Sequence, residues 1–176
     1  ASVTAVEIDP RAVAAIEELR ESDPARLRIV AADALALDLA TLVAAPRQVI
    51  ANLPYNVASP LLVGWLRQAE AWERLTLMFQ QEFGERICAA PDPPAYGRLS
   101  VLAQWVGTAE FRLRIPPAAF VPPPKVTGTM VRIEPRVTPL APAPVKELEV
   151  VCRQVFGQRR KMLSNAITYA APPPPT

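Results

Sequence analysis

The stretch Val49-Ile50-Ala51-Asn52-Leu53-Pro54-Tyr55 decides how this chain is interpreted. Its first three residues form a short apolar run, as in a buried strand of a parallel sheet. Open α/β sheets bind ligands beyond the carboxyl ends of their strands. Pro54 restricts Leu53 to extended geometry and has no N–H to donate. We therefore expect the side-chain carbonyl of Asn52 and the main-chain carbonyl of Leu53 to face one ligand, with Tyr55 beside them.

Two hydrogen-bond acceptors beside a flat aromatic ring suit an exocyclic amino group on a flat heterocycle, such as N6 of adenine. The alternative interpretation is a strand end followed by a proline turn and a packed tyrosine. For an isolated Asn-x-Pro-Tyr motif the alternative is preferred, so the rest of the chain has to decide.

The composition excludes several kinds of chemistry. The chain has 176 residues, 51% of them hydrophobic, and no histidine. Catalytic triads, histidine metal sites and histidine proton shuttles are therefore excluded, and we expect no metal. Cys88 and Cys152 are far apart and are expected to be reduced thiols. The sequence contains no apolar run long enough to span a membrane, and we expect a cytoplasmic protein.

The charge is distributed unevenly along the chain. Residues 1–110 contain 9 arginines and 14 acidic residues, a net charge of −5. Residues 111–176 contain 10 basic and 3 acidic residues, a net charge of +7. A basic second half predicts contact with a polyanion, although a solvated basic tail explains the charge equally well.

The hydrophobic pattern predicts an α/β fold. Strands are expected at residues 2–8, 27–31, 49–53 and 75–79, and helices at 11–20, 57–68 and 81–89. This alternation predicts a doubly wound, mostly parallel sheet with helices on both faces. Further on, we expect helices at 96–106 and 145–156, a strand at 110–115, and an antiparallel edge strand at 127–133. The predicted domains are 1–134 and 145–176, joined by a proline-rich linker at 135–144.

Seven segments, in order, match one known family. They are VEID at 6–9, ADAL at 32–35, NLPYN at 52–56, MFQQEFGERI at 78–87, YGRLSVLAQ at 96–104, FVPPPKV at 120–126 and FGQRRKMLSNAI at 156–167. The chain resembles the rRNA adenine N6,N6-dimethyltransferases, which use S-adenosylmethionine and act near the 3′ end of small-subunit rRNA. The resemblance implies a Rossmann-like methyltransferase domain followed by a small helical RNA-binding domain.

The family pattern also predicts missing parts. Such enzymes have a strand, a glycine-rich loop and a helix before the VEID segment, and more helices after the last match. We therefore expect this sequence to lack the cofactor loop and most of the C-terminal domain. It should then be inactive by itself and bind S-adenosylmethionine weakly or not at all. The missing strand would lie between residues 3–8 and 49–53, so we predict that these two strands do not pair directly.

The resemblance assigns the cofactor contacts to the ends of the first strands. Glu7, with Ile8 beside it, would accept hydrogen bonds from the ribose hydroxyls of the cofactor. Asp33 and Ala34 would contact its adenine, and Asn52 would also approach it. The alternatives are a solvated acid at position 7 and a helix cap at position 33.

The catalytic residues implied by the resemblance are Asn52, Leu53, Pro54, Tyr55 and Phe120. Asn52 and the Leu53 carbonyl would hold the N6 amino group of the target adenine. Tyr55 and Phe120 would stack on the two faces of the extruded base. The alternative for Phe120 is packing against the sheet.

Four cations are assigned to RNA phosphates: Lys125, Arg159, Arg160 and Lys161. Arg112 and Arg114 add to the same basic half. Phosphate contacts position RNA without reading its sequence. The alternative for each cation is a solvated surface position. We expect a monomer whose partner is the small ribosomal subunit.

Three other functions remain open from the sequence: methylation of large-subunit rRNA, methylation of adenine in DNA, and non-catalytic RNA binding during ribosome assembly. The last matched segment favours the small-subunit branch over the large-subunit methylases.

Overall fold

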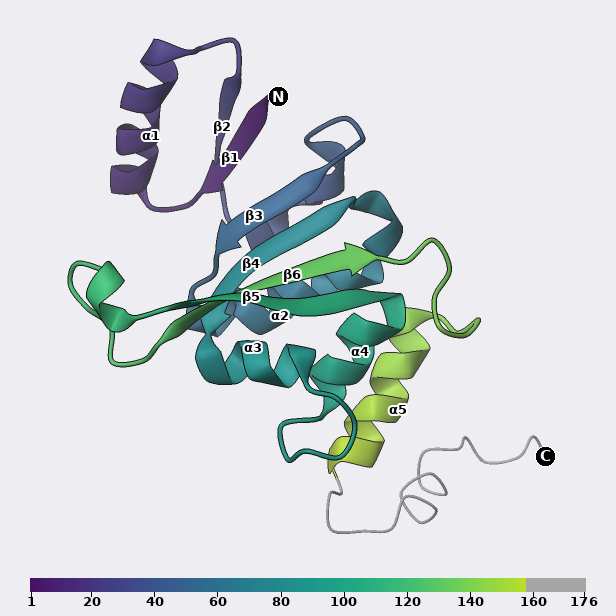
Figure 1. Cartoon of the computed structure of the whole chain (residues 1–176). Helices are drawn as coiled ribbons and strands as arrows, with labels where there is room; N and C mark the ends of the chain where they lie inside the picture. The colour runs from purple at the N-terminus through teal and green to yellow at the C-terminus, as the bar shows by residue number, and fades with distance from the viewer. Residues whose placement is uncertain (158–176) are drawn as a thin grey trace. The chain divides into compact units, whose positions relative to one another are not determined.

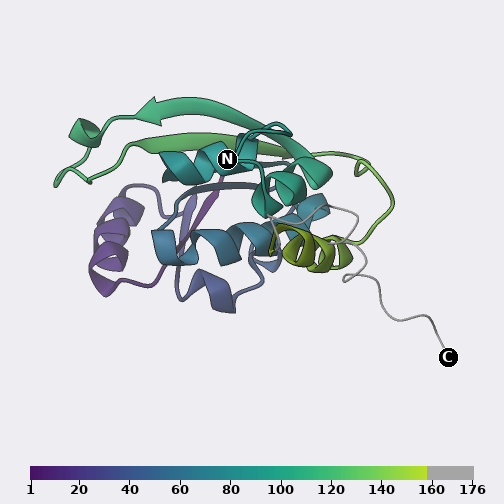
Figure 2. The ribbon, with the colours of Figure 1, turned by 90° about the horizontal axis from the view of Figure 1, so that it is seen from below.

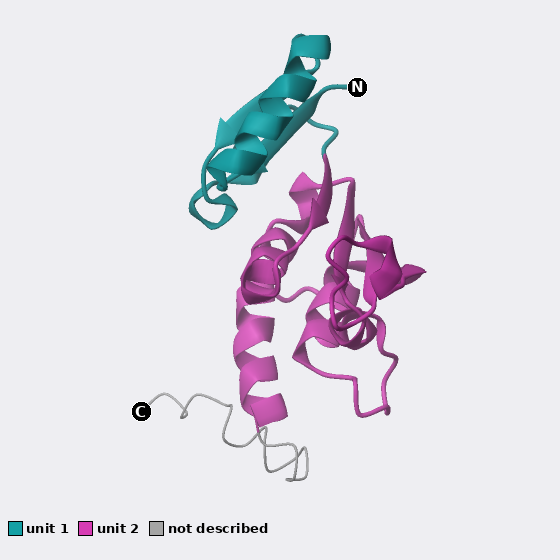
Figure 3. Cartoon of the chain, turned by 90° about the vertical axis from the view of Figure 1, so that its left-hand side faces the viewer, with its two compact units in different colours: residues 1–47 teal, residues 48–176 magenta. Residues whose placement is uncertain are grey.

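The computed structural model describes residues 1–157 and has the expected α/β fold (Figure 1). The chain divides into two compact units, Ala1–Arg47 and Gln48–Thr176 (Figure 3). The domain boundary predicted at residues 134 and 135 therefore differs from this division and stays a prediction.

Unit 1 is a parallel strand pair with one helix. It contains β1 (Val3–Glu7), α1 (Pro10–Ser22), β2 (Leu27–Ala31) and two short 3-10 turns, η1 (Ala34–Ala36) and η2 (Leu39–Thr41). The two strands pair in parallel from Val3 opposite Leu27 to Glu7 opposite Ala31. Asp9 caps α1, where Pro10 supplies a preset backbone angle at the first helical position.

Unit 2 contains a four-stranded mixed sheet in the order β3-β4-β6-β5. The strands are β3 (Gln48–Asn52), β4 (Arg74–Gln80), β5 (Gly107–Ile115) and β6 (Gly128–Pro135). The helices are α2 (Tyr55–Arg67), α3 (Gln81–Cys88), α4 (Arg98–Val106) and α5 (Val145–Gly157), with short 3-10 turns at η3 (Ala69–Ala71) and η4 (Pro117–Ala119). β3 and β4 are parallel, whereas β6 is antiparallel to both β4 and β5.

The core of unit 2 lies between the sheet and its helices, which gather on one side of the strands (Figure 2). Leu75, Leu77 and Phe79 alternate along β4 and are buried. The predicted apolar face of α2 is also buried: Leu61, Leu62, Trp65 and Leu66. Alternation with period two along a strand places every second side chain on the helix-covered face.

One predicted strand position is wrong. β6 was expected at the sheet edge, but it lies between β4 and β5. Val131 and Ile133 of β6 are completely buried, whereas Leu113 of β5 is 58% exposed. After β5 the chain turns back, and β6 runs antiparallel between β5 and β4. The hydrophobic pattern of one strand does not indicate which strands will be its neighbours.

Helix starts also differ from the prediction. α2 begins at Tyr55 rather than at residue 57, because Val57 and Ala58 already donate to the Pro54 carbonyl at 3.1 and 3.0 Å. α4 begins at Arg98 rather than at residue 96, since Tyr96 belongs to a turn that returns to Pro93.

The apolar spacing that predicted α1 does not correspond to a buried face. None of its residues is buried, and Leu19 remains 68% exposed.

The prediction that residues 3–8 and 49–53 do not pair is confirmed. Within residues 1–157, β1 pairs with β2 and β3 pairs with β4, and the two pairs belong to different sheets. Ile50 on β3 is 78% exposed. An unpaired, apolar strand edge of this kind is a site where another strand adds readily.

None of the helices within residues 1–157 is both long enough and apolar enough to cross a lipid bilayer. Both cysteines are free thiols, as expected. Burial raises the pKa of Cys88 to about 11, with the Glu110 charge as a smaller cause. The thiol is therefore neutral near pH 7.

Candidate active site

The residues expected to be catalytic meet at one pocket of unit 2. Asn52, Leu53, Pro54, Tyr55 and Phe120 all line a cavity of about 590 Å³. The first four come from the end of β3 and the first turn of α2, and Phe120 follows η4. The pocket therefore joins positions that are far apart in the sequence. The roles assigned to these residues stay predictions.

The backbone leaves two acceptors available at the end of β3. Leu53 donates its N–H to the Met78 carbonyl at 3.3 Å, which extends the β3–β4 pairing by one residue. Pro54 then turns the chain at φ −57° and ψ 142°, and the first hydrogen bonds of α2 go to its carbonyl. Within residues 1–157, no hydrogen bond occupies the Leu53 carbonyl or the Asn52 side chain. Both groups border the cavity.

Aromatic and apolar side chains form the rest of the pocket. Tyr55 is 61% exposed and Phe120 is half-buried, so both rings are accessible. A Cβ atom added at Gly128 would lie 3.7 Å from Cζ of Phe120, which places this ring against the start of β6. The remaining lining residues are Asn56, Met78, Phe79, Pro122, Pro124 and Val126. No lining residue carries a charge, and such a pocket suits an uncharged aromatic ring.

Seven residues of this pocket received no site role from the sequence, among them Met78, Phe79 and Gly128. The parallel register explains the first two, because Met78 lies opposite Asn52. Neighbouring parallel strands end at the same edge of a sheet, so the last residues of the strand predicted at 75–79 are the sequence signal for this part of the pocket. Gly128 reaches the pocket through the antiparallel pairing of β6 with β4, for which the sequence offered no signal.

Unit 1 presents two carboxylates at the carboxyl ends of its parallel strands. Glu7 closes β1, and its Oε1 accepts the N–H groups of Ile8 and Asp9 at 2.7 and 2.9 Å. Asp33 follows β2, and its Oδ1 accepts the Leu35 N–H at 2.9 Å. The capping interpretation of Asp33 is thus realised. In each carboxylate one oxygen orients the group while the second is not used in these bonds.

The other predicted cofactor contacts are divided between the two units: Ile8 and Ala34 belong to unit 1, and Asn52 to unit 2. Ile8 is 66% exposed after β1, and Ala34 opens η1 half-buried. Asn52 belongs to unit 2 and to the pocket described above. Their contact with a cofactor stays a prediction.

One of the four predicted RNA-binding cations lies within the described residues. Lys125 is exposed in the loop before β6, whereas Arg159, Arg160 and Lys161 lie outside the described residues. Arg112 pairs with Glu110 at 3.0 Å, and Arg114 lies over the Phe111 ring at 5.5 Å. These two arginines are engaged within β5 itself.

The described residues contain no group of three potential metal ligands.

Comparison with known proteins gives a consistent result. Residues 1–174 match the sequence profile of the family described as Ribosomal RNA adenine dimethylase. The Ribosomal RNA small subunit methyltransferase A of Gluconobacter oxydans is 58% identical over 94% of this chain and 54% of that protein. The protein of the same description from Rhodospirillum rubrum is 53% identical over 92% and 56%. The chain thus spans little more than half the length of these relatives.

Two solved structures share the fold. A dimethyladenosine transferase from Plasmodium falciparum superposes with a TM-score of 0.79, 25% identity, and coverage of 94% of this chain and 59% of that one. The 23S rRNA methyltransferase ErmE superposes with a TM-score of 0.73 and 24% identity, covering 97% and 68%. The second likeness shows the fold alone.

Proposed function

The chain belongs to the ribosomal RNA adenine dimethylase family, and we propose that the full-length protein dimethylates N6 of adjacent adenosines near the 3′ end of small-subunit rRNA. The family description names the base, and the relatives named Ribosomal RNA small subunit methyltransferase A support the choice of RNA. The methyl donor is S-adenosylmethionine, and the reaction belongs to ribosome biogenesis. We expect a cytoplasmic monomer whose partner is the small ribosomal subunit.

The observation that carries this proposal is the pair of acceptors at the end of β3. The Asn52 side-chain carbonyl and the Leu53 main-chain carbonyl accept no other hydrogen bond within residues 1–157 and border a neutral pocket. The lone pair of an adenine amino group is delocalised into the ring, so the nitrogen is a poor nucleophile. Two acceptors outside the ring plane favour a more tetrahedral nitrogen, and its lone pair then becomes available for methylation. This chemistry relies on positioning and needs no histidine base.

Aromatic stacking holds the base in this position. A base in a folded RNA has to leave its stack before N6 can be reached, and this extrusion costs a few kcal/mol. Tyr55 and Phe120 compensate by presenting accessible rings on the same pocket. Each stacking contact is worth about 1–3 kcal/mol.

The carboxylates of unit 1 fit the adenosyl part of the cofactor. Glu7 has one oxygen held by two main-chain N–H groups and Asp33 has one held by a single N–H, and the second oxygen of each accepts none of these bonds. We assign Glu7 to the ribose hydroxyls, with Ile8 beside it, and Asp33 with Ala34 to the adenine. When bound, S-adenosylmethionine supplies a methyl group activated by positively charged sulfur.

A substrate panel tests the proposal. The full-length protein is incubated with methyl-labelled S-adenosylmethionine and with unmethylated small subunits, large subunits or DNA. We expect label on adenine N6 in the small subunit alone. Label in large-subunit rRNA or DNA instead would contradict the substrate assignment. Binding to small subunits without any labelling would contradict the enzymatic role and favour an assembly factor.

A further inference from the structure

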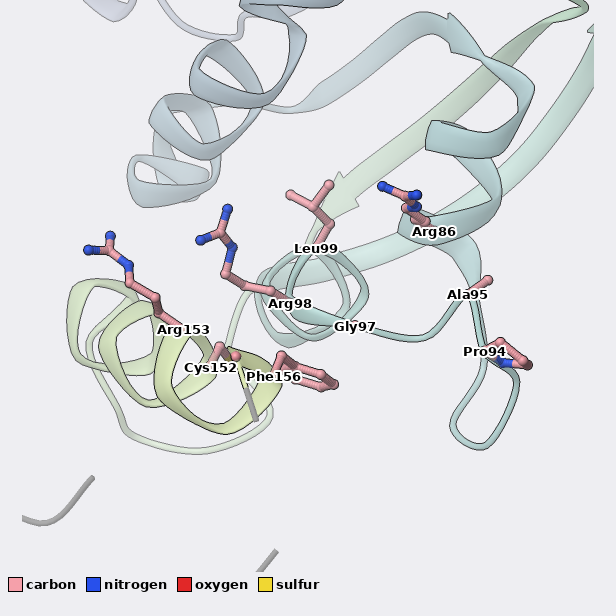
Figure 4. A pocket seen from close by; sticks show the side chains of 10 residues that line it. Arg86, Pro94, Ala95, Gly97, Arg98, Leu99, Cys152, Arg153 and Phe156 are labelled. Carbon is pink, nitrogen blue, oxygen red and sulfur yellow. The ribbon is translucent and has the colours of Figure 1, made fainter. Parts of the chain in front are cut away.

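A second cleft of unit 2 is not used by the proposed function. Its volume is about 510 Å³, and it lies where α3, the loop before α4, α4 and α5 come together (Figure 4). Arginines from three different helices line it: Arg86 on α3, Arg98 on α4 and Arg153 on α5. We call it the arginine cleft.

The arginine cleft carries excess positive charge. Arg86 pairs with Glu82 one turn earlier, but neither Arg98 nor Arg153 forms an ion pair within residues 1–157. Glu149, on the same helix as Arg153, is already bound by Arg67 through both oxygens, each at 2.7 Å. Arg67 lowers the pKa of Glu149, with smaller contributions from the charges of Arg153 and Arg98. The guanidinium groups of Arg98 and Arg153 therefore interact with the Glu149 carboxylate through charge alone and form no hydrogen bond with it.

The wall of the cleft adds no compensating negative charge. Cys152 lines it, and burial raises the pKa of this thiol, so it is neutral at physiological pH. Phe156 lines the cleft as well, and its ring meets Tyr96 edge-on at 6.1 Å. In Figure 4 the Arg98 and Arg153 side chains point in the same general direction from their helices.

Hydrogen bonds of a buried serine hold α3 and α4 together. The Ser100 hydroxyl donates to the Arg86 carbonyl and accepts the Gly97 N–H at 3.0 Å. Ser100 is completely buried, so the start of α4 is fastened to α3. The backbone positions of Arg86 and Arg98 are therefore set before any ligand arrives, which reduces the entropy lost on binding.

We infer that the arginine cleft binds the phosphodiester backbone of the RNA substrate. Arginine presents a planar fork of N–H donors that matches two phosphate oxygens, and it stays charged at any physiological pH. All three arginines are exposed. An open cleft with exposed donors suits a strand that enters and leaves, whereas a single mononucleotide would favour an enclosed site. The choice of RNA rests on the proposed function.

The location allows one RNA to use both sites. Phe79 lines the base pocket at the end of β4, and α3 follows directly and carries Arg86 near its other end. The eight residues of α3 span about 12 Å at 1.5 Å per residue. An RNA strand whose base enters the pocket is therefore long enough to place its backbone in the arginine cleft, where phosphate contacts would position it without reading its sequence.

The test measures the affinity for RNA against salt concentration, without cofactor. The probe is a labelled hairpin RNA whose loop carries two adjacent adenosines. Arg98→Ala/Arg153→Ala is compared with Arg11→Ala/Arg20→Ala, which removes the same charge from α1. Each phosphate contact contributes about 0.7 to the magnitude of the slope of log K against log salt. We therefore expect the magnitude of this slope to fall by about 1.4 in the cleft variant, which loses two contacts, and to stay unchanged in the α1 variant. If affinities converge at 1 M salt, this loss corresponds to about 25-fold weaker binding at 0.1 M.

Two further measurements extend the test. Arg98→Lys/Arg153→Lys keeps the charges and should keep the salt slope, while binding weakens because the fork is lost. An unchanged slope in the alanine variant, or an equal loss in the α1 control, overturns the inference. If the alanine variant does not fold, RNA should still protect Arg98 and Arg153 of the unmodified protein from phenylglyoxal, and equal reactivity with and without RNA overturns it.

These results are separable from those that test the proposed function. Methyl transfer with an unchanged salt slope overturns the arginine cleft alone. A reduced slope without methyl transfer supports the cleft and contradicts the enzymatic role. Binding of a polyglutamate peptide is compared in the same variants. If Arg98→Ala/Arg153→Ala loses binding to the peptide but still binds RNA normally, the cleft is not an RNA site, and its partner is an acidic protein.

Discussion

Unit 2 contains two clefts of similar size with opposite chemistry. The base pocket is lined by two amide side chains, three aromatic rings, three prolines and no charged residue. The arginine cleft has three arginines among its ten lining residues. One lies where a parallel strand ends, and the other where three helices meet.

This difference teaches how one scaffold divides the recognition of a nucleic acid. A neutral aromatic pocket distinguishes a base by stacking and hydrogen bonds, and its affinity depends little on salt. Arginines that hold phosphates act through charge, so their contribution falls as salt rises. The comparison predicts that variants of the two clefts change different measurable quantities.

The largest effect is expected from Asn52→Ala. Loss of one preorganised acceptor should reduce kcat/KM for methyl transfer by about 10²–10³. Stability should change little, because this side chain is exposed and makes no hydrogen bond within residues 1–157. Gln48→Ala, at the other end of β3, is the matched amide control and should remain active. Near-normal activity of Asn52→Ala in the full-length protein would remove its assigned role.

Tyr55→Ala should weaken binding of the adenosine-containing RNA by about 1–3 kcal/mol, roughly 5- to 150-fold. The salt slope should stay unchanged, since no phosphate contact is lost. Tyr55→Phe keeps the ring and should bind normally. A change of slope in Tyr55→Ala would show that the two clefts do not act separately.

Gly84→Ala tests whether α3 connects the two clefts. A Cβ atom there would lie 2.3 Å from Cγ2 of Thr129 and 3.1 Å from Cγ2 of Val131, so α3 would be pushed away from β6. We expect a loss of about 1–3 kcal/mol in the free energy of unfolding, measured with urea, and weaker function of both clefts. Gly64→Ala is the control, because nothing lies within 4 Å of its added Cβ, and it should stabilise α2 by about 0.5–1 kcal/mol. Equal stabilities of the two variants would contradict the close packing of α3.

The smallest effect concerns the ion pair that fastens α5, one wall of the arginine cleft. The Glu149 side chain is 8% exposed and its partner Arg67 is 43% exposed, so the pair is worth only about 1 kcal/mol. Arg67 lowers the pKa of Glu149 in the folded state. The stabilisation is therefore present above the ordinary glutamate pKa of about 4.3 and disappears as the pH falls through the lower folded value.

Glu149→Gln should consequently be less stable than the unmodified protein at pH 6, and the difference should shrink toward pH 3. Urea unfolding at several pH values measures this. Glu147→Gln, exposed on the same helix, should change stability by less than about 0.5 kcal/mol. A difference for Glu149→Gln that is independent of pH would mean that the charge of Glu149 does not stabilise α5.

Much of the fold was predictable because its signals are local. The alternation of apolar residues placed β4 within one residue at each end, and the apolar stripe of α2 identified its buried face. The position of β6 was not predictable, since strand order depends on which edges pair after the chain returns. The same holds for α2, whose start depends on the hydrogen bonds accepted by Pro54.

The candidate site divides in the same way. Asn52 to Tyr55 were predicted as a unit because a strand end, a proline and an aromatic residue are adjacent in the chain. Asp33 was predicted as a cofactor ligand, with a helix cap as the alternative; its side chain forms the cap bond, and the ligand role stays a prediction. The arginine cleft could not be predicted from the sequence. Arg86, Arg98 and Arg153 belong to three separate helices, and no local sequence pattern indicates that these helices pack together.

The sequence by itself determined the element types, the family and the motif at the end of β3, because these depend on residues within one turn or one strand. Only the tertiary structure decided which distant side chains join that motif and which arginines gather around α4. Arg67 pairs with Glu149, which is 82 residues further along the chain, and Phe120 lies beside Gly128 at the start of β6. Such contacts follow from sheet order and helix packing, which are set by burial of the whole core.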